Sequence, residues 1–169
     1  MKKRFFIIAV ISGIAAFFLV GGILAGTDVS DVIELNDPTY KKHKKGIVKL
    51  SHKKHQTDYA KQYPEFYKAG CGECHHDKDN KPLSGLKEGD DVQKCIECHK
   101  IAAEMPKKDV KAMRKKKASK KEIKSKKLEY HAEAYHYNCK GCHRLYNKKY
   151  KPKKKAPATC SKCHPKKKK

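Results

Sequence analysis

The chain has 169 residues, of which 42 are lysine or arginine and only 18 are aspartate or glutamate, so its formal net charge is +24. With 36% charged residues and no tryptophan, it has too little apolar surface for an ordinary globular domain stabilised by a core of its own. Arginine, which binds phosphate with a bidentate fork, occurs only at Arg4, Arg114 and Arg144, so the composition disfavours a nucleic-acid partner. Acidic proteins or an anionic membrane surface fit the charge better.

The N-terminal segment, residues 1–26, has the pattern of an export signal. Three basic residues precede an uncharged apolar run of 22 residues, 5–26. A membrane-spanning helix needs about 20 apolar residues and the apolar part of a cleaved signal about 7–15, so the length favours a retained signal anchor. The small residues of Leu24-Ala25-Gly26 favour the alternative, a cleaved signal peptide. Either way, the rest of the chain is expected on the periplasmic side of the cytoplasmic membrane.

The first elements after this segment are a short strand and a helix. Residues 47–50 predict the strand, and Ser51 is a suitable N-cap for a helix that carries His52 and His55 and stops before Pro64. Residues three positions apart share one face of a helix. The two histidines can therefore serve two adjacent sites.

The sequence Cys-x-x-Cys-His occurs four times and accounts for all eight cysteines. The motifs are Cys71, Cys74 and His75; Cys95, Cys98 and His99; Cys139, Cys142 and His143; and Cys160, Cys163 and His164. In c-type haem attachment the two thiols bond to the vinyl groups of one porphyrin, and the histidine binds its iron. Zinc half-sites or redox-active cysteine pairs are disfavoured because histidine follows all four pairs, which chance would rarely produce, and disulfides leave the four trailing histidines unexplained. The motifs predict four covalently attached haem c groups, which supply the missing core.

The intervals between the motifs differ in composition. Residues 77–91 are polar and lack periodicity, which predicts a surface loop. Residues 105–128 contain twelve basic residues against Asp109 and Glu122, with a weak amphipathic stripe. A solvated helix is favoured there over a partly disordered arm. Residues 128–138 carry three tyrosines and two histidines and are expected to cover a haem face, the alternative being a plain helix leading into the third motif.

The histidines outside the motifs provide the second ligand of each iron. There are six of them, of which four are needed: His43, His52, His55, His76, His131 and His136. Met105 and Met113 cannot serve four irons, so two histidines per iron and low reduction potentials are expected. His75 and His76 are neighbours and point apart. Two irons bound through one peptide unit can be no more than roughly 17 Å apart.

Three stretches of the chain carry a family resemblance: Ser51-His52-Lys53-Lys54-His55, Cys71-Gly72-Glu73-Cys74-His75-His76, and Glu88-Gly89-Asp90-Asp91-Val92-Gln93-Lys94-Cys95. They resemble the class III cytochromes c, the tetrahaem carriers of the cytochrome c3 kind. The resemblance implies that His52 completes the site of Cys71 and Cys74, His76 that of Cys95 and Cys98, and His55 that of Cys139 and Cys142. His136 is assigned to the site of Cys160 and Cys163, with His131 as its competitor. His43 is expected at the surface or against a haem propionate.

The expected fold is mostly irregular, with short α-helices and little β structure wrapped around four haems, preceded by one N-terminal hydrophobic helix. Residues 27–45 are interpreted as a tether and residues 46–169 as the tetrahaem domain, with residues 105–128 as a lysine-rich insertion.

The resemblance implies a low-potential periplasmic electron carrier of anaerobic respiration that is not an enzyme. Its expected partners are acidic redox proteins such as periplasmic hydrogenase, formate dehydrogenase or membrane redox complexes. Two alternatives stay open: a membrane-tethered conduit subunit of a larger redox assembly, and a small multihaem reductase with one open iron.

Overall fold

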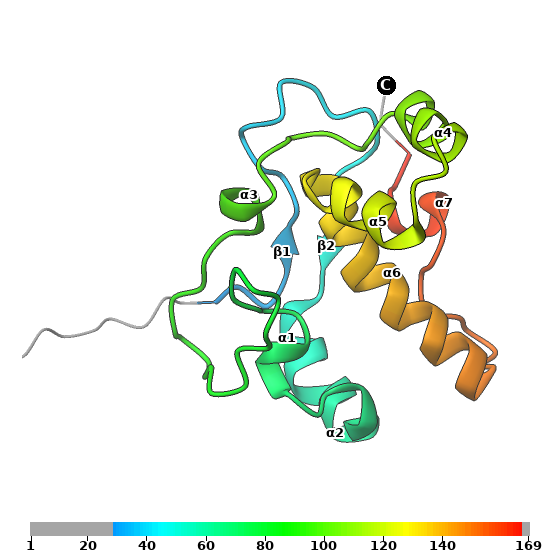
Figure 1. The fold of residues 1–169 in the computed structure, drawn as a ribbon. Helices are drawn as coiled ribbons and strands as arrows, with labels where there is room; N and C mark the ends of the chain where they lie inside the picture. Colours follow the sequence, from blue (N-terminus) through cyan, green and yellow to red (C-terminus); the bar gives the residue numbers. More distant parts are fainter. Residues whose placement is uncertain (1–28, 167–169) are drawn as a thin grey trace, which may run out of the picture.

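The computed structural model describes residues 29–166 (Figure 1). The expected N-terminal hydrophobic helix, whether signal or anchor, lies outside the described residues. Across residues 29–166 none of the helices combines the length and the apolar character needed to cross a membrane. The described part is mostly helical and irregular with little sheet, as expected.

A two-stranded antiparallel sheet opens the domain. Strand β1 (Ile33–Glu34) pairs with β2 (Lys49–Leu50), with Ile33 opposite Leu50 and Glu34 opposite Lys49. A 2.9 Å ion pair joins Lys49 to Glu34 across the ladder. β1 lies within the segment interpreted as a tether, so this part of it pairs with the strand that precedes the first helix.

The expected first helix is present and contains a widened turn. It consists of α1 (His52–Lys54), the π-helical η1 (His55–Tyr59) and α2 (Ala60–Gln62), and it ends before Pro64 as predicted. Ser51 occupies the N-cap position, as predicted, although its side chain makes no capping hydrogen bond.

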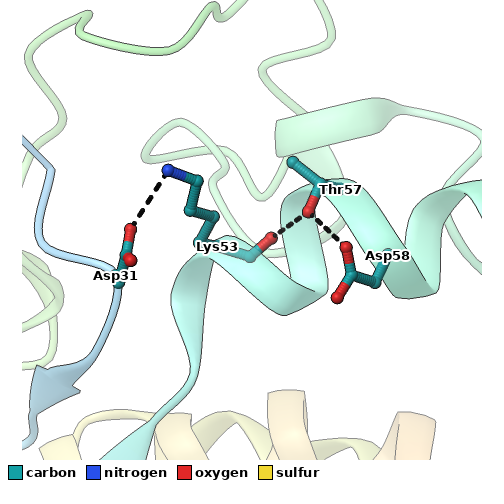
Figure 2. Close-up of polar contacts among 4 residues, drawn as sticks. All are labelled: Asp31, Lys53, Thr57 and Asp58. Carbon is teal, nitrogen blue, oxygen red and sulfur yellow. Dashed lines mark hydrogen bonds and ion pairs between the residues drawn. The ribbon is translucent and has the colours of Figure 1, made fainter.

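Side-chain contacts support the helix near its π turn, as Figure 2 shows. The Thr57 hydroxyl donates to the Lys53 carbonyl at 2.9 Å and also lies 2.9 Å from the carboxylate of Asp58. Lys53 reaches back to Asp31, two residues before β1, at 3.3 Å. The ion pair of Lys53 with Asp31 ties the helix that carries His52 and His55 to the segment just before β1.

Short helical segments carry three of the cysteine motifs. They are η3 (Gly70–Glu73), α3 (Cys95–Cys98) and α7 (Cys160–Cys163). A further short segment, η2 (Pro64–Phe66), follows α2. Most of residues 77–91 is exposed and irregular, which confirms the predicted surface loop.

Most of the segment interpreted as a lysine-rich insertion forms two helices, α4 (Lys107–Lys115) and α5 (Lys120–Leu128), which together we call the lysine hairpin. Ser119 starts α5 with a reciprocal capping box: its hydroxyl accepts from the Glu122 amide at 3.2 Å, and its own amide donates to the Glu122 carboxylate at 2.6 Å. The favoured helix is thus confirmed over the disordered arm, although it is broken into two.

Helix α6 (His131–Tyr150) has 20 residues and crosses the centre of the molecule in Figure 1. It carries the third motif, so the plain helix considered for residues 128–138 is present and continues through that motif. The expectation of short helices only is therefore wrong at α6. The helix ends where Lys151 adopts a left-handed conformation with φ 44°.

The described residues contain almost no apolar core. Met105 is their only buried hydrophobic side chain, at 5% exposure, and the other buried side chains are His131 and Glu133. Hydrophobic burial between these helices is therefore too small to explain their arrangement.

One partly buried ion pair fastens the lysine hairpin to α6. The Lys127 ammonium lies 2.9 and 3.0 Å from the two carboxylate oxygens of Glu133, whose side chain is only 6% exposed. Removal of one partner leaves a buried charge unpaired. We expect Lys127→Ala to lower the free energy of unfolding of the haem-loaded protein by about 2 kcal/mol, measured by urea denaturation.

The matched control is Lys126→Ala. Lys126 pairs with Glu129 at 2.6 Å, but both side chains are half exposed. An exposed pair contributes about 0.5 kcal/mol or less. Equal losses in the two variants would contradict a special role for the pair of Lys127 and Glu133.

Candidate functional site

Eight histidines form four facing pairs, and each pair joins a motif histidine to one outside the motifs. The ring centroids are 6.4 Å apart for His52 and His75, 6.1 Å for His76 and His99, 6.0 Å for His55 and His143, and 6.4 Å for His136 and His164. These are the pairings that the family resemblance implies. The partners are distant in sequence, and the fold brings them together.

The separation suits one metal ion between each pair. A histidine nitrogen bonds a transition metal at about 2.0–2.1 Å, and two such bonds plus half a ring at each end span about 6 Å. Rings in direct stacking contact would be closer. Each pair therefore offers two nitrogens on opposite sides of one metal position.

Hydrogen bonds orient five of these eight rings. In each the Nδ1 atom faces a backbone carbonyl: His55 the carbonyl of Ser51 (2.8 Å), His76 that of Asp77 (2.7 Å), His143 that of Pro157 (2.6 Å), His164 that of Gly46 (2.9 Å), and His99 that of Leu128. A carbonyl only accepts, so Nδ1 carries the proton and Nε2 is left with a lone pair. This second contact is the usual way in which proteins orient a metal-binding histidine.

Burial favours the neutral form that a ligand needs. It lowers the pKa of His75, His136 and His143 below the ordinary value for histidine. Nearby histidines act in the same direction: His52 on His75, and His55 on His143. The imidazole nitrogens are therefore available at neutral pH.

The adjacent residues His75 and His76 belong to different pairs. His75 faces His52, whereas His76 faces His99. An isolated antiparallel bridge fixes the backbone here, because the Leu83 amide donates to the His75 carbonyl at 2.9 Å and His76 pairs with Pro82.

None of the eight cysteines is paired in a disulfide, so every motif keeps both of its thiols for haem attachment. At the second motif, a hollow open to solvent is lined by both cysteines and by both rings of the facing pair: Cys95, Cys98, His99 and His76. Leu83 and Val92 give this hollow an apolar wall. The thiols, two imidazoles and apolar surface that a covalently bound haem requires thus lie around one space.

Each histidine pair provides only two ligands, so it suits a metal ion that is already bound by other groups. In residues 29–166, no group of three or more His, Cys, Asp and Glu side chains is arranged to hold a metal ion. A structural zinc ion takes four protein ligands. A haem iron takes four nitrogens from the porphyrin and needs two more, so the residues present fit haem.

His131, the competitor for the fourth site, lies elsewhere. It is 2% exposed and packs against the rings of Tyr40 at 5.7 Å and Tyr135 at 4.9 Å, whereas His136 faces His164. Its Nδ1 atom is buried without a hydrogen-bond partner among the described residues. His43 is half buried and stacks on Tyr40 with centroids 5.4 Å apart.

Several supporting groups had no signal in the sequence. The carbonyls of Leu128, Pro157 and Gly46 orient motif histidines, and any residue type provides a carbonyl. Of these three residues, Gly46 alone has a residue type that its place in the structure requires, because a Cβ there would overlap the Pro165 carbonyl. Only glycine lets this strand-side loop approach the fourth motif so closely.

Asparagines on α6 also hold other segments in place. Asn138 donates to the Cys74 carbonyl at 3.1 Å. Asn147 donates to the Ala156 carbonyl and accepts from its amide, both at 2.8 Å, which places the loop that carries the Pro157 carbonyl.

Comparison with known families gives one match. A family model described as the class III cytochrome C family matches residues 30–164, which include all four motifs and all four histidine pairs. The chain belongs to the class III cytochrome c family. Its cofactors are covalently attached haem c groups, and it is a multihaem electron-transfer protein. No curated protein matches the chain, and no solved structure does.

Proposed function

We propose that this class III cytochrome is a low-potential periplasmic electron carrier in which two histidines bind each of four irons. The observation that carries the proposal is the set of four histidine pairs with ring centroids 6.0–6.4 Å apart. The motif cysteines would attach the porphyrins. His75, His99, His143 and His164 would be the motif-side ligands, and His52, His76, His55 and His136 their respective partners.

Haem supplies one-electron chemistry when bound. The protein side chains determine its reduction potential and whether a substrate can reach the iron. Two neutral imidazoles stabilise ferric iron more than a histidine and a methionine do, which supports low potentials. Met105 is buried, and each motif histidine already faces the ring of a second histidine, which leaves no iron that needs a methionine ligand. A histidine on both sides also leaves no iron position for a substrate, and this favours a carrier over a reductase.

Spin state provides the direct test. We expect the low-temperature electron paramagnetic resonance spectrum of the oxidised, fully loaded protein to integrate to four low-spin ferric irons, because each has two imidazole ligands. A high-spin signal of one iron per molecule would show an open site. The reductase would then replace the carrier as the best-supported function.

The charge of the chain supports acidic partners such as a periplasmic hydrogenase, a formate dehydrogenase or a membrane redox complex. Haem carboxylates reduce a formal charge of +24 but leave the protein strongly positive. Attraction between opposite charges increases association rates by about 10-fold to 1,000-fold, and salt screens it. We expect the second-order rate of reduction by an acidic plant-type ferredoxin to fall about tenfold from low to 0.5 M ionic strength, measured by stopped flow. A rate independent of salt would contradict the acidic partner.

The apolar run of residues 5–26 favours a second candidate, a membrane-tethered conduit subunit with the same haem sites. Its length exceeds that of a usual cleaved signal. The mass of the mature protein distinguishes the two, because the conduit requires that this run be retained.

A further inference from the structure

The lysine hairpin is the most highly charged element of the described residues. Eleven of its twelve basic side chains are exposed: Lys107, Lys108, Lys111, Arg114, Lys115, Lys116, Lys117, Lys120, Lys121, Lys124 and Lys126. Only Asp109 and Glu122 oppose them, and the Glu122 carboxylate is held in the capping box of α5. The hairpin therefore has a net charge of twelve minus two, or +10, within 22 residues.

The hairpin presents this charge outward from a fixed position. Its apolar side chains Val110, Met113, Ile123 and Leu128 are half buried. On α5, Lys127 is bound to Glu133 of α6, and Lys124 lies over the Tyr137 ring of α6 at 5.4 Å. Of the twelve basic side chains, Lys126 and Lys127 alone form ion pairs with acidic residues in the described part of the chain.

The end of the hairpin lies against the second haem site. Its last residue, Leu128, accepts the hydrogen bond from the ring of His99. The residues after Leu128 also bond to the segment that follows His99. The Ile101 amide donates to the Glu129 carbonyl at 3.1 Å, and the His131 amide donates to the Ile101 carbonyl at 2.9 Å. One hydrogen bond therefore separates this basic element from an iron ligand.

We infer that the exposed face of the lysine hairpin is a docking surface for an acidic redox protein, which it holds beside the second haem site of Cys95, Cys98, His76 and His99. The inference rests on the proposed carrier function and adds to it the place of contact. A redox protein is favoured over a lipid surface because the hairpin is bonded to an iron ligand. Nucleic acid is disfavoured because eleven of the twelve cations are lysine.

The test compares two variants of the haem-loaded protein that lose the same charge. The first replaces Lys111, Lys115, Lys120 and Lys121 with glutamine. The control replaces Lys148, Lys153, Lys154 and Lys155 with glutamine, all exposed near the end of α6 and in the loop after it. Glutamine keeps helix propensity close to that of lysine, and no substituted residue takes part in an ion pair among residues 29–166. An unchanged haem spectrum and far-ultraviolet circular dichroism confirm folding.

Binding of an acidic plant-type ferredoxin is measured by calorimetry at low ionic strength. We expect the dissociation constant to rise about tenfold or more for the hairpin variant and less than threefold for the control. In nuclear magnetic resonance spectra, ferredoxin should shift signals of residues around His99 before those of the other sites.

Other outcomes overturn the inference without removing the carrier. Equal weakening in the two variants would mean that only net charge matters. Greater weakening in the control would place docking at the end of α6. If the hairpin variant loses binding to anionic phospholipid vesicles but keeps its affinity for ferredoxin, the hairpin is a membrane-binding surface and not a docking surface for a redox protein. Failure of the carrier function itself would show separately, as a high-spin iron in the unsubstituted protein.

Discussion

Replacing His136 with alanine is expected to leave one iron of the four without its second protein ligand. The His136 ring faces that of His164 at 6.4 Å, and no other histidine ring faces His164 among the described residues. The electron paramagnetic resonance spectrum of the oxidised variant should show one high-spin iron and three low-spin irons. Added imidazole should restore the low-spin signal, because the substitution leaves space where the ring was.

His131→Ala provides the control for this assignment. His131 lies five residues away on the same helix and was the competing candidate, but it contacts Tyr40 and Tyr135 in place of a motif histidine. All four irons should stay low-spin in this variant. The reverse pattern, with a high-spin iron only in His131→Ala, would show that the fourth pair is assigned wrongly.

The chain without haem is expected to be largely unfolded. Ordering the backbone costs about 1–2 kcal/mol per residue, and burial of apolar side chains normally offsets this cost. Met105 is the only buried hydrophobic side chain among residues 29–166, so the offset must come from the porphyrins. Protein produced without haem attachment should show little helical circular dichroism and poorly dispersed amide signals.

The haem-loaded protein, measured in the same buffer, should show the helices described here. Retention of helix α6 and of dispersed amide signals by the haem-free chain would contradict this expectation. It would mean that contacts such as that of Lys127 with Glu133 are enough to hold the fold.

The sequence predicted the chemistry of the sites better than their supports. Attachment of haem fixes both the spacing of the cysteines and the following histidine, so the four motifs are readable. The spacing of His52 and His55 also showed that they can serve two sites. The structure adds that His52 begins α1 whereas His55 begins the π-helical η1. The carbonyls that orient His99 and His143 have no side-chain signature, and only the fold reveals them.

At two positions the helices do not follow the local preference of the residue. The hairpin breaks after α4 where Lys117 adopts a left-handed conformation with φ 57°, a position that glycine usually marks. In contrast, Gly141 weakens helix propensity inside the third motif, yet α6 continues through it to Tyr150. In both places tertiary context overrides the preference of the residue.

The four histidine pairs also determine how the chain responds to a break in its backbone. A protease cut within the exposed loop 77–91 separates His55 from His143 and His76 from His99 along the chain, but both pairs span the cut. With iron bound between the rings as proposed, each pair would act as a cross-link between the two fragments. The nicked protein would therefore stay in one piece under native conditions, in the way that a disulfide-bonded protein survives cleavage of a surface loop.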